Sequence, residues 1–346
     1  MNTLNLALVG CGNMSGDHAR NFLKLPEAKI VALCDTVPAQ TQSFRKQFFP
    51  DAAEFTSYDA LLDMAKKIPG KDGASVQLDG VVLVTPHTLH HAQCKAALAR
   101  GLHVLCEKPM VTSSPDAYDL WKAVKKSGKI FAIAYQSPYS REFGYLAAER
   151  DAGHLGKIQL ISAYLSQGWL QATANTWRQN PALSGGGQMY DSGAHLLNAF
   201  MWLINDPVVE VACFYDTCGS PVDINGVAAV KFANGVMGSI CIGGNCPNFR
   251  TEIEIQTDKM LIVTNQYGSK LEMTGRGNVP IYPHIAPDDR PAAGTPQANF
   301  VNAILRGEPL RAPVRYGVLL SALMDAMYQS AREQKPVRVQ PVPADI

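Results

Sequence analysis

The sequence lacks the features that mark membrane, exported and nucleic-acid-binding proteins. No apolar run approaches the roughly 20 residues that a membrane-spanning helix needs, and the first residues lack the basic start of a signal peptide. The formal net charge is only +1, so the chain has no field that would attract nucleic acid or an anionic membrane. We therefore expect a cytoplasmic protein that binds a small, largely neutral molecule.

Cysteine is present but is not arranged as a metal site. The eight cysteines are scattered, and the pairs Cys213/Cys218 and Cys241/Cys246 are spaced more widely than the ligand pairs of common zinc sites. We therefore predict no metal centre and interpret most cysteines as buried thiols. Cys11, beside a candidate cofactor loop, is interpreted as small apolar filler in preference to a reactive thiol.

A glycine-rich turn joins the first predicted strand to the first predicted helix. Residues 4–9 form a short apolar run, Gly10-Cys-Gly-Asn-Met-Ser-Gly follows, and helical spacing begins at Asp17. This order places backbone N–H groups and a helix N-terminus against a pyrophosphate. Ser15 takes the third position of the usual G-x-G-x-x-G pattern and is small enough to keep the helix close to the strand. The pattern predicts a dinucleotide site that includes Gly10, Gly12, Asn13 and Met14.

The second predicted strand, residues 29–34, ends at Asp35. Asp35 follows Gly10 by 25 residues, close to the position of a carboxylate that binds both ribose hydroxyls of a dinucleotide. An acid there repels a 2′-phosphate, which favours NAD over NADP. The alternative is that Asp35 caps the turn that follows it.

Two further buried strands, residues 79–85 and 102–106, end in polar segments. Open α/β sheets bind ligands at the carboxyl ends of their parallel strands. As alternatives, His90 has a structural role at a helix start, and the charged pair after the second strand is an exposed loop. We predict that the cofactor-binding residues from these segments are Thr85, His87, His90, Glu107 and Lys108.

The second half of the chain offers residues suited to a substrate. Helical spacing predicts a helix over residues 188–204, which would place Asp191 and His195 on one face because they are four residues apart. The alternative is that His195 is a core histidine oriented by Asp191. Trp177 and Arg178 lie on a preceding loop, and carbohydrate sites often use an aromatic face and an arginine. Plain packing is the alternative for the tryptophan.

Period-two apolar patterning from residue 208 to residue 271 predicts an antiparallel meander with one apolar face, with a hairpin turn at Asn234-Gly235. Helices over 297–305 and 316–334 and a strand at 336–339 close the chain. At 346 residues the chain exceeds the roughly 250–300 residues at which single cores stop growing, so two domains are expected.

These motifs, taken in order, resemble the glucose-fructose oxidoreductase / inositol dehydrogenase (Gfo/Idh/MocA) family of NAD(P)-dependent oxidoreductases. The most specific part is Glu107-Lys108-Pro109 combined with Asp191-x-Gly-x-His195. The resemblance implies an α/β fold: an N-terminal Rossmann domain with a doubly wound parallel sheet at 1–136, and a C-terminal α+β domain at 137–346 with an open-faced, mostly antiparallel sheet. The last helix and strand are expected near the domain junction. A cis bond before Pro109 and a homo-oligomer, dimer or tetramer, are also implied.

The expected activity is NAD-dependent hydride transfer between nicotinamide and a hydroxyl-bearing carbon of a sugar, polyol or sugar derivative. Such a reaction needs a base near neutral pH, so we assign the proton to His195 and Lys108 together and favour His195. Lys108 would stabilise charge on the same oxygen, and Asp191 would orient the imidazole or a sugar hydroxyl. The expected substrate contacts are Trp177, Arg178 and Asn198.

Two other functions stay open. A glycoside hydrolase that retains NAD and oxidises the sugar transiently would use the same hydride and proton groups. A non-catalytic, NAD-responsive binding protein is disfavoured by the joint presence of Lys108, Asp191 and His195.

Overall fold

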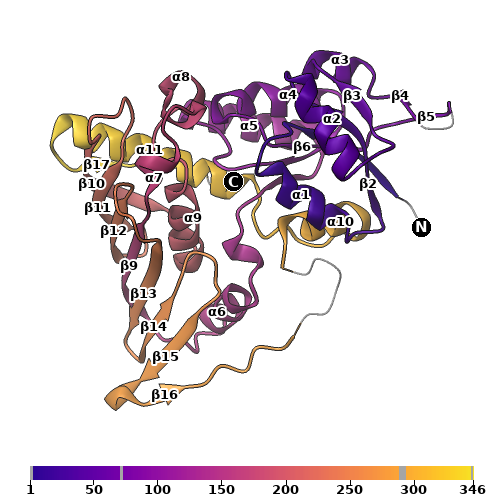
Figure 1. Cartoon of the computed structure of the whole chain (residues 1–346). Coiled ribbons are helices and arrows are strands. Elements are labelled where there is room, and N and C mark those ends of the chain that lie inside the picture. Colours follow the sequence, from indigo (N-terminus) through magenta and orange to yellow (C-terminus); the bar gives the residue numbers. More distant parts are fainter. Residues whose placement is uncertain (1–2, 71–72, 288–293, 344–345) are drawn as a thin grey trace. The chain divides into compact units, whose positions relative to one another are not determined.

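The computed structural model describes residues 3–70, 73–287, 294–343 and 346 (Figure 1). Contacts group the chain into two compact units. The first comprises Met1–Met110, Tyr118–Ala134 and Asp288–Val314, and the second comprises Val111–Ala117, Tyr135–Pro287 and Arg315–Ile346. A single division after residue 136 does not describe this grouping, because α10 (Pro296–Arg306) packs in the first unit.

The first unit contains a six-stranded parallel sheet with the order β3-β2-β1-β6-β7-β8. Its strands are β1 (Leu4–Val9), β2 (Ala28–Cys34), β3 (Ala53–Phe55), β6 (Gly80–Leu83), β7 (His103–Cys106) and β8 (Phe131–Ile133). The chain order within the sheet reverses between β1 and β6, which is the doubly wound arrangement of a Rossmann fold. The predicted N-terminal fold is confirmed.

Helices and a short hairpin complete the first unit. The helices are α1 (Ser15–Phe22), α2 (Pro38–Gln47), α3 (Tyr58–Asp63), η1 (His87–Leu89), α4 (His90–Ala99), α5 (Ser114–Ser127), whose first residues belong to the second unit, and α10. The hairpin pairs β4 (Ile68–Pro69) with β5 (Ser75–Val76). Leu6, Leu8 and Val82 are fully buried, as expected for apolar strands covered on both faces.

The second unit contains a nine-stranded sheet with the order β16-β15-β14-β13-β9-β12-β11-β10-β17. Its strands are β9 (Ile158–Ser166), β10 (Val208–Asp216), β11 (Asn225–Phe232), β12 (Met237–Gly243), β13 (Arg250–Thr257), β14 (Met260–Thr264), β15 (Leu271–Gly275), β16 (Pro280–Ile281) and β17 (Val337–Arg338). Only β9 and β12 pair in parallel, so the mostly antiparallel sheet is confirmed.

The helices of the second unit are η2 (Ser137–Tyr139), α6 (Arg141–Asp151), α7 (Trp169–Ala172), η3 (Trp177–Gln179), α8 (Pro181–Ser184), α9 (Gly193–Ile204), η4 (Arg276–Asn278) and α11 (Val314–Glu333). Of these, α9 packs on one face of the sheet. Phe200 of α9 lies directly over Gly238 of β12, where a Cβ would come within 2.4 Å of the ring. Side chains of the other face stay exposed, among them Phe214 at 68% and Val227 and Met237 at 55% each. The sheet is therefore open-faced.

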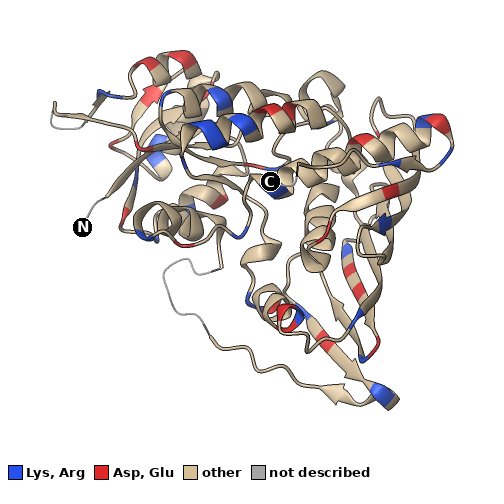
Figure 2. Cartoon of the chain, turned by 180° about the vertical axis from the view of Figure 1, so that it is seen from behind, with Lys and Arg blue, Asp and Glu red and all other residues tan. Residues whose placement is uncertain are grey.

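Charged residues of both signs are interspersed over the helices and strands (Figure 2). Among the described residues, none of the helices has the length and apolar character needed to cross a membrane. The same described residues contain no group of three or more His, Cys, Asp or Glu side chains that could hold a metal ion.

Candidate active site

The glycine turn after β1 is tightly built on one side and open on the other. Gly10 has a φ of +86°, and a Cβ there would lie 2.4 Å from the carbonyl oxygen of Val84, so only glycine fits. The hydroxyl of Ser15 donates to the Gly10 carbonyl at 2.5 Å. At Gly12 a Cβ would meet nothing within 4 Å. The turn is thus fixed from within, and its open side begins at Gly12.

Three backbone N–H groups on this open side are available to a ligand. The N–H groups of Gly12, Asn13 and Met14 donate no hydrogen bond to any residue that the structure describes. They directly precede α1, whose N-terminus carries a partial positive charge. Adjacent N–H groups at a helix start suit a phosphate group, so the geometry fits the pyrophosphate of a dinucleotide.

Asp35 ties the second strand to this turn. Its Oδ2 accepts the Cys11 N–H at 2.8 Å, and its Oδ1 accepts the Val37 N–H at 2.9 Å. The carboxylate therefore caps its own turn and also holds the glycine turn, and each oxygen keeps a lone pair for a ribose hydroxyl.

The two cysteines beside Asp35 are unsuited to nucleophilic chemistry. Burial, with Asp35 nearby, raises the pKa of Cys11 to about 12 and that of Cys34 to about 12. A protonated thiol is a weak nucleophile. The interpretation of Cys11 as buried filler is confirmed, since it is 0% exposed.

His90 links the ends of two strands. It is fully buried, with Nδ1 2.8 Å from the Pro109 carbonyl oxygen and Nε2 2.9 Å from the Thr85 carbonyl oxygen. Burial alone would lower its pKa, but Cys106 and the two carbonyls raise it to about 9. Since both ring nitrogens are engaged, the contacts favour the structural role. His87 is buried beside it, with the ring centroids 6.1 Å apart.

Glu107 belongs to a buried network that the sequence did not reveal. Its Oε1 lies 2.8 Å from Nε2 of His18, and Nδ1 of His18 lies 2.8 Å from Nε2 of Gln297. Because an amide nitrogen can only donate, His18 accepts from Gln297 and donates to Glu107. His18 and Gln297 are 279 residues apart, so no local pattern joins them.

Lys108 follows this network directly. Its N–H donates to Oε2 of Glu107 at 3.0 Å, and the Lys108–Pro109 bond is cis, as expected. Lys108 is half-buried. Its backbone is thereby held through Glu107 to His18, at the carboxyl end of β7.

In the second unit, Asp191 is the centre of a hydrogen-bonded cluster. It is 5% exposed, and its Oδ2 accepts from Nε1 of Trp169 at 2.7 Å and from Nε of Arg178 at 3.0 Å. The Arg178 guanidinium also lies over the Trp177 ring, 4.5 Å from its centroid. The Nη groups of Arg178 have no hydrogen-bond partner among residues that the structure describes, so they stay available to a polar ligand.

The expected helix over 188–204 is wrong at its start. α9 begins at Gly193, and Asp191 lies in the preceding turn, so Asp191 and His195 do not share a helix face. The physical reason is that the backbone hydrogen bonds at the start of α9 are not α-helical. The Gly193 N–H bonds to the Gln188 carbonyl five residues back, and the N–H groups of Ala194 and His195 bond to the carbonyls of Asp191 and Ser192 three residues back.

His195 is half-buried on the first turn of α9. Its ring contacts the Tyr135 ring edge-on at 6.4 Å and the Tyr267 ring at 6.0 Å between centroids. Asn198, one turn later, is 0% exposed, and its amide has no hydrogen-bond partner in the described part of the chain. His195 is therefore placed among aromatic rings at a partly open position, whereas Asn198 is enclosed.

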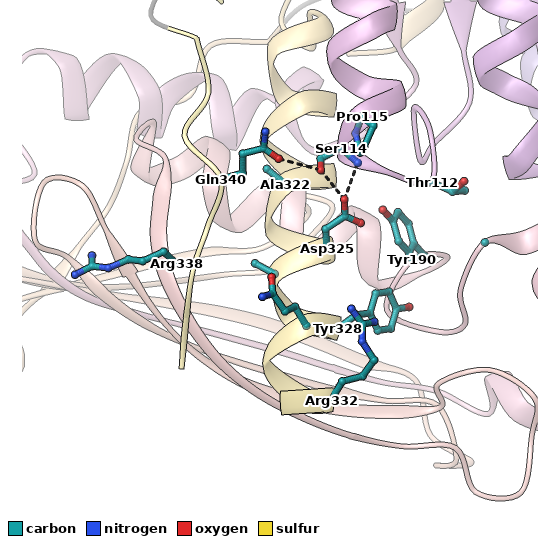
Figure 3. Close-up of a pocket in the computed structure, with 13 residues that line it drawn as sticks. Thr112, Ser114, Pro115, Tyr190, Ala322, Asp325, Tyr328, Arg332, Arg338 and Gln340 are labelled. Atoms are coloured by element: carbon teal, nitrogen blue, oxygen red, sulfur yellow. Dashed lines mark hydrogen bonds between the residues drawn. The ribbon is translucent and has the colours of Figure 1, made fainter. Parts of the chain in front are cut away.

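A separate cavity of about 470 Å³ lies in the second unit (Figure 3). α11 contributes Asp325, whose Oδ2 accepts from the Ser114 N–H at 2.7 Å and from the Ser114 hydroxyl at 2.6 Å. Tyr190 and Tyr328 line the same cavity, but neither Asp191 nor His195 does. The cavity is therefore distinct from the Asp191 cluster.

Comparisons with known proteins match both units. A family model described as "Oxidoreductase family, NAD-binding Rossmann fold" matches residues 4–135. A second model, "GFO/IDH/MocA C-terminal domain", matches residues 145–263.

Two curated relatives carry dehydrogenase names. D-glucoside 3-dehydrogenase of Escherichia coli K12 is 26% identical over 213 residues, which cover 60% of this chain and 56% of that protein. Inositol 2-dehydrogenase 4 of Saccharopolyspora erythraea is 26% identical over 249 residues, covering 70% of this chain and 68% of that protein. The chain thus spans little more than half of the first relative.

Solved structures share the fold over nearly the whole chain. Levoglucosan dehydrogenase in complex with NADH and L-sorbose has a TM-score of 0.86 at 19% identity, with 99% of this chain and 100% of that chain covered. The WlbA dehydrogenase of Bordetella pertussis, in complex with NADH and UDP-GlcNAcA, has a TM-score of 0.80 at 24% identity, with the same two coverages of 99% and 100%.

Proposed function

Because the chain belongs to the Gfo/Idh/MocA family of NAD-binding oxidoreductases, we propose that it is an NAD-dependent dehydrogenase of a sugar, polyol or sugar derivative. The observation that carries the proposal is the turn after β1, where three adjacent N–H groups without partners among the described residues lie beside the anchored carboxylate of Asp35. The names of the curated relatives support a hydroxyl-bearing ring as substrate.

The residues of the first unit fit the cofactor. The N–H groups of Gly12, Asn13 and Met14 would hold the pyrophosphate, and Asp35 would hold the ribose hydroxyls. NAD, when bound, accepts the hydride from the carbinol carbon of the substrate. Thr85, His87 and His90 line the neighbouring strand end, where His90 fixes the loops through its two carbonyl contacts.

The proton of the substrate hydroxyl is assigned to His195 and Lys108. A neutral imidazole can accept a proton near neutral pH, and the Lys108 ammonium stabilises negative charge that develops on the same oxygen. Asp191 holds Arg178 and Trp169 in place through its Oδ2. The free Nη groups of Arg178 and the ring of Trp177 would then contact the sugar.

The open face of the second-unit sheet supports a homo-oligomer. Across the strands, Phe214 pairs with Val227, Val227 with Cys241, and Cys241 with Tyr164, which makes an apolar row on the exposed side. Exposed apolar patches of this kind mark association surfaces. We therefore assign this face to contact with another copy of the chain, in a dimer or tetramer.

The test is a panel of sugars and polyols assayed for NADH formation with NAD and with NADP. Net NADH formation is expected, and Lys108→Met and His195→Ala should each lower turnover by about 10²–10⁴-fold. His154→Ala is the matched control, because the His154 side chain is 67% exposed and should leave turnover unchanged. Glycoside release without net NADH would establish the redox-assisted hydrolase, and NAD binding without either reaction would establish a binding protein.

A further inference from the structure

The glycine segment at residues 185–187, shortly before Asp191, is packed against Asp223 and Tyr328, which come from distant parts of the second unit. A Cβ on Gly187 would lie 1.9 Å from the carbonyl oxygen of Asp223. A Cβ on Gly186 would lie 2.5 Å from the hydroxyl oxygen of Tyr328 and 2.8 Å from the ring of Tyr190. Both positions therefore require glycine because the backbone itself touches Asp223 and Tyr328.

Asp223 binds this segment through three consecutive N–H groups. Its Oδ1 accepts from Gly187 at 2.7 Å and its Oδ2 accepts from Met189 at 2.8 Å. Its backbone oxygen accepts from Gln188 at 2.9 Å. The Tyr328 hydroxyl donates to the same Oδ1 at 2.5 Å. Asp223, which is only 3% exposed, thus fixes three residues of the loop, two through its carboxylate and one through its backbone oxygen.

Two backbone hydrogen bonds link the glycine segment to Asp191 and to the start of α9. The Asp191 N–H donates to the Gly187 carbonyl at 2.9 Å, and the Gly193 N–H donates to the Gln188 carbonyl at 2.9 Å. Gly193 is the first residue of α9, and His195 follows two residues later. Any shift of the glycine segment would therefore move Asp191 and the start of α9 together.

We propose that Asp223 and Tyr328 are positioning residues that hold Asp191 and His195 in their working geometry. The proposal rests on the proposed function, in which Asp191 and His195 act on the substrate. Asp223 is not a catalytic residue, since its carboxylate is occupied by three donors of the protein. Tyr328 stacks on Tyr190, with ring centroids 6.0 Å apart (Figure 3). It therefore also contacts the residue that directly precedes Asp191.

The kinetic test uses Tyr328→Phe and Asp223→Asn. Tyr328→Phe keeps the ring stacking and removes one hydrogen bond, and Asp223→Asn sets an amide N–H₂ against a backbone N–H. Misplacing catalytic groups by about 1 Å can cost about 10²-fold, so Asp223→Asn should lower kcat about 100-fold and Tyr328→Phe about 10-fold. KM for NAD should stay within about two-fold, because the residues that would hold NAD belong to the first unit.

Ser330→Ala is the matched control. Ser330 lies two residues from Tyr328 on α11, is 1% exposed, accepts the Cys213 N–H at 3.0 Å and donates to the Lys335 carbonyl at 2.7 Å. Ser330→Ala should lower the free energy of unfolding about as much as Tyr328→Phe does, but should leave kcat unchanged. Equal kcat for Tyr328→Phe and Ser330→Ala, or an unchanged kcat in Asp223→Asn, would overturn the proposal.

A second readout does not depend on activity. The Trp169 indole N–H donates to Asp191, so its NMR resonance reports the position of that carboxylate. Asp223→Asn and Tyr328→Phe should shift this resonance and speed amide exchange at Gly187 and Met189, whereas Ser330→Ala should do neither. An unmoved resonance would refute the positioning role. If the wild-type chain oxidised no sugar, the proposed function would fail while this measurement still decided the role of Asp223.

Discussion

Replacing His18 with leucine should show how much the His18–Glu107 hydrogen bond contributes to the stability of the first unit. His18 is 2% exposed and Glu107 is 9% exposed, so Oε1 of Glu107 has little access to water if its 2.8 Å partner is removed. Nε2 of Gln297 would lose its acceptor at the same time. The substitution therefore removes one hydrogen bond from each of two buried polar groups.

The two losses set the size of the effect. A hydrogen bond to a charged group contributes about 1.5–3 kcal/mol, and a buried donor left without a partner costs about 1–3 kcal/mol. We expect His18→Leu to lower the free energy of unfolding of the first unit by about 3–5 kcal/mol. For a unit of roughly 150 residues, this corresponds to a Tm about 10 °C lower.

Scanning calorimetry of three variants separates the terms. Gln297→Met removes the hydrogen bond to His18 and the longer one from Asn21, leaves the His18–Glu107 contact in place, and should cost about 1–2 kcal/mol. The double variant His18→Leu/Glu107→Leu should be more stable than His18→Leu alone, because it no longer buries a carboxylate that has lost its histidine partner. If the double variant were the less stable of the two, or if His18→Leu cost less than about 1 kcal/mol, the argument from the buried charge would be wrong.

Three other predictions follow from the first unit. Asp35→Ala should weaken NAD binding more than NADP binding in a fluorescence titration, because the carboxylate favours ribose hydroxyls and repels a 2′-phosphate; equal losses would contradict the cofactor assignment. Gly10→Ala should lower the unfolding free energy by more than about 1 kcal/mol, because the residue has a φ of +86° and no space for a Cβ; a melting temperature equal to that of Gly12→Ala would refute this. Unfolding free energy should fall as pH rises from about 9 towards 12, because unfolded thiols ionise near 9 while Cys11 and Cys34 hold their protons to about 12; urea titrations at pH 8 and pH 10 on the wild type and Cys11→Ala should show a smaller change in the variant.

Local pattern was sufficient for the parts of the chain whose structure is set by neighbouring residues. The run before Gly10, the turn after it and the strand that ends at Asp35 were predicted because each is a strand or turn signal within a few residues. The period-two segments of the second half likewise became β10 to β14. In these places local preference and tertiary packing agree.

The misses have a common physical cause. Helical spacing predicted a helix from Gln188, but Asp223, a residue 36 positions from Gly187, holds this segment in a turn. Gln297, one of the two partners of His18, likewise comes from α10. A single sequence shows which residues can donate or accept, but not which distant residue they meet.

The contribution of α10 to the first unit has a consequence for synthesis of the chain. The N–H of Ile133, at the end of the edge strand β8, bonds to the carbonyl of Ala312. The buried ring of His18 needs Gln297 of α10 as its hydrogen-bond donor. Domains usually fold as they emerge from the ribosome, N-terminal part first. Here the first unit cannot complete its contacts until nearly the whole polypeptide has been translated, so a chain stalled before α10 would present an unfinished domain to chaperones and proteases.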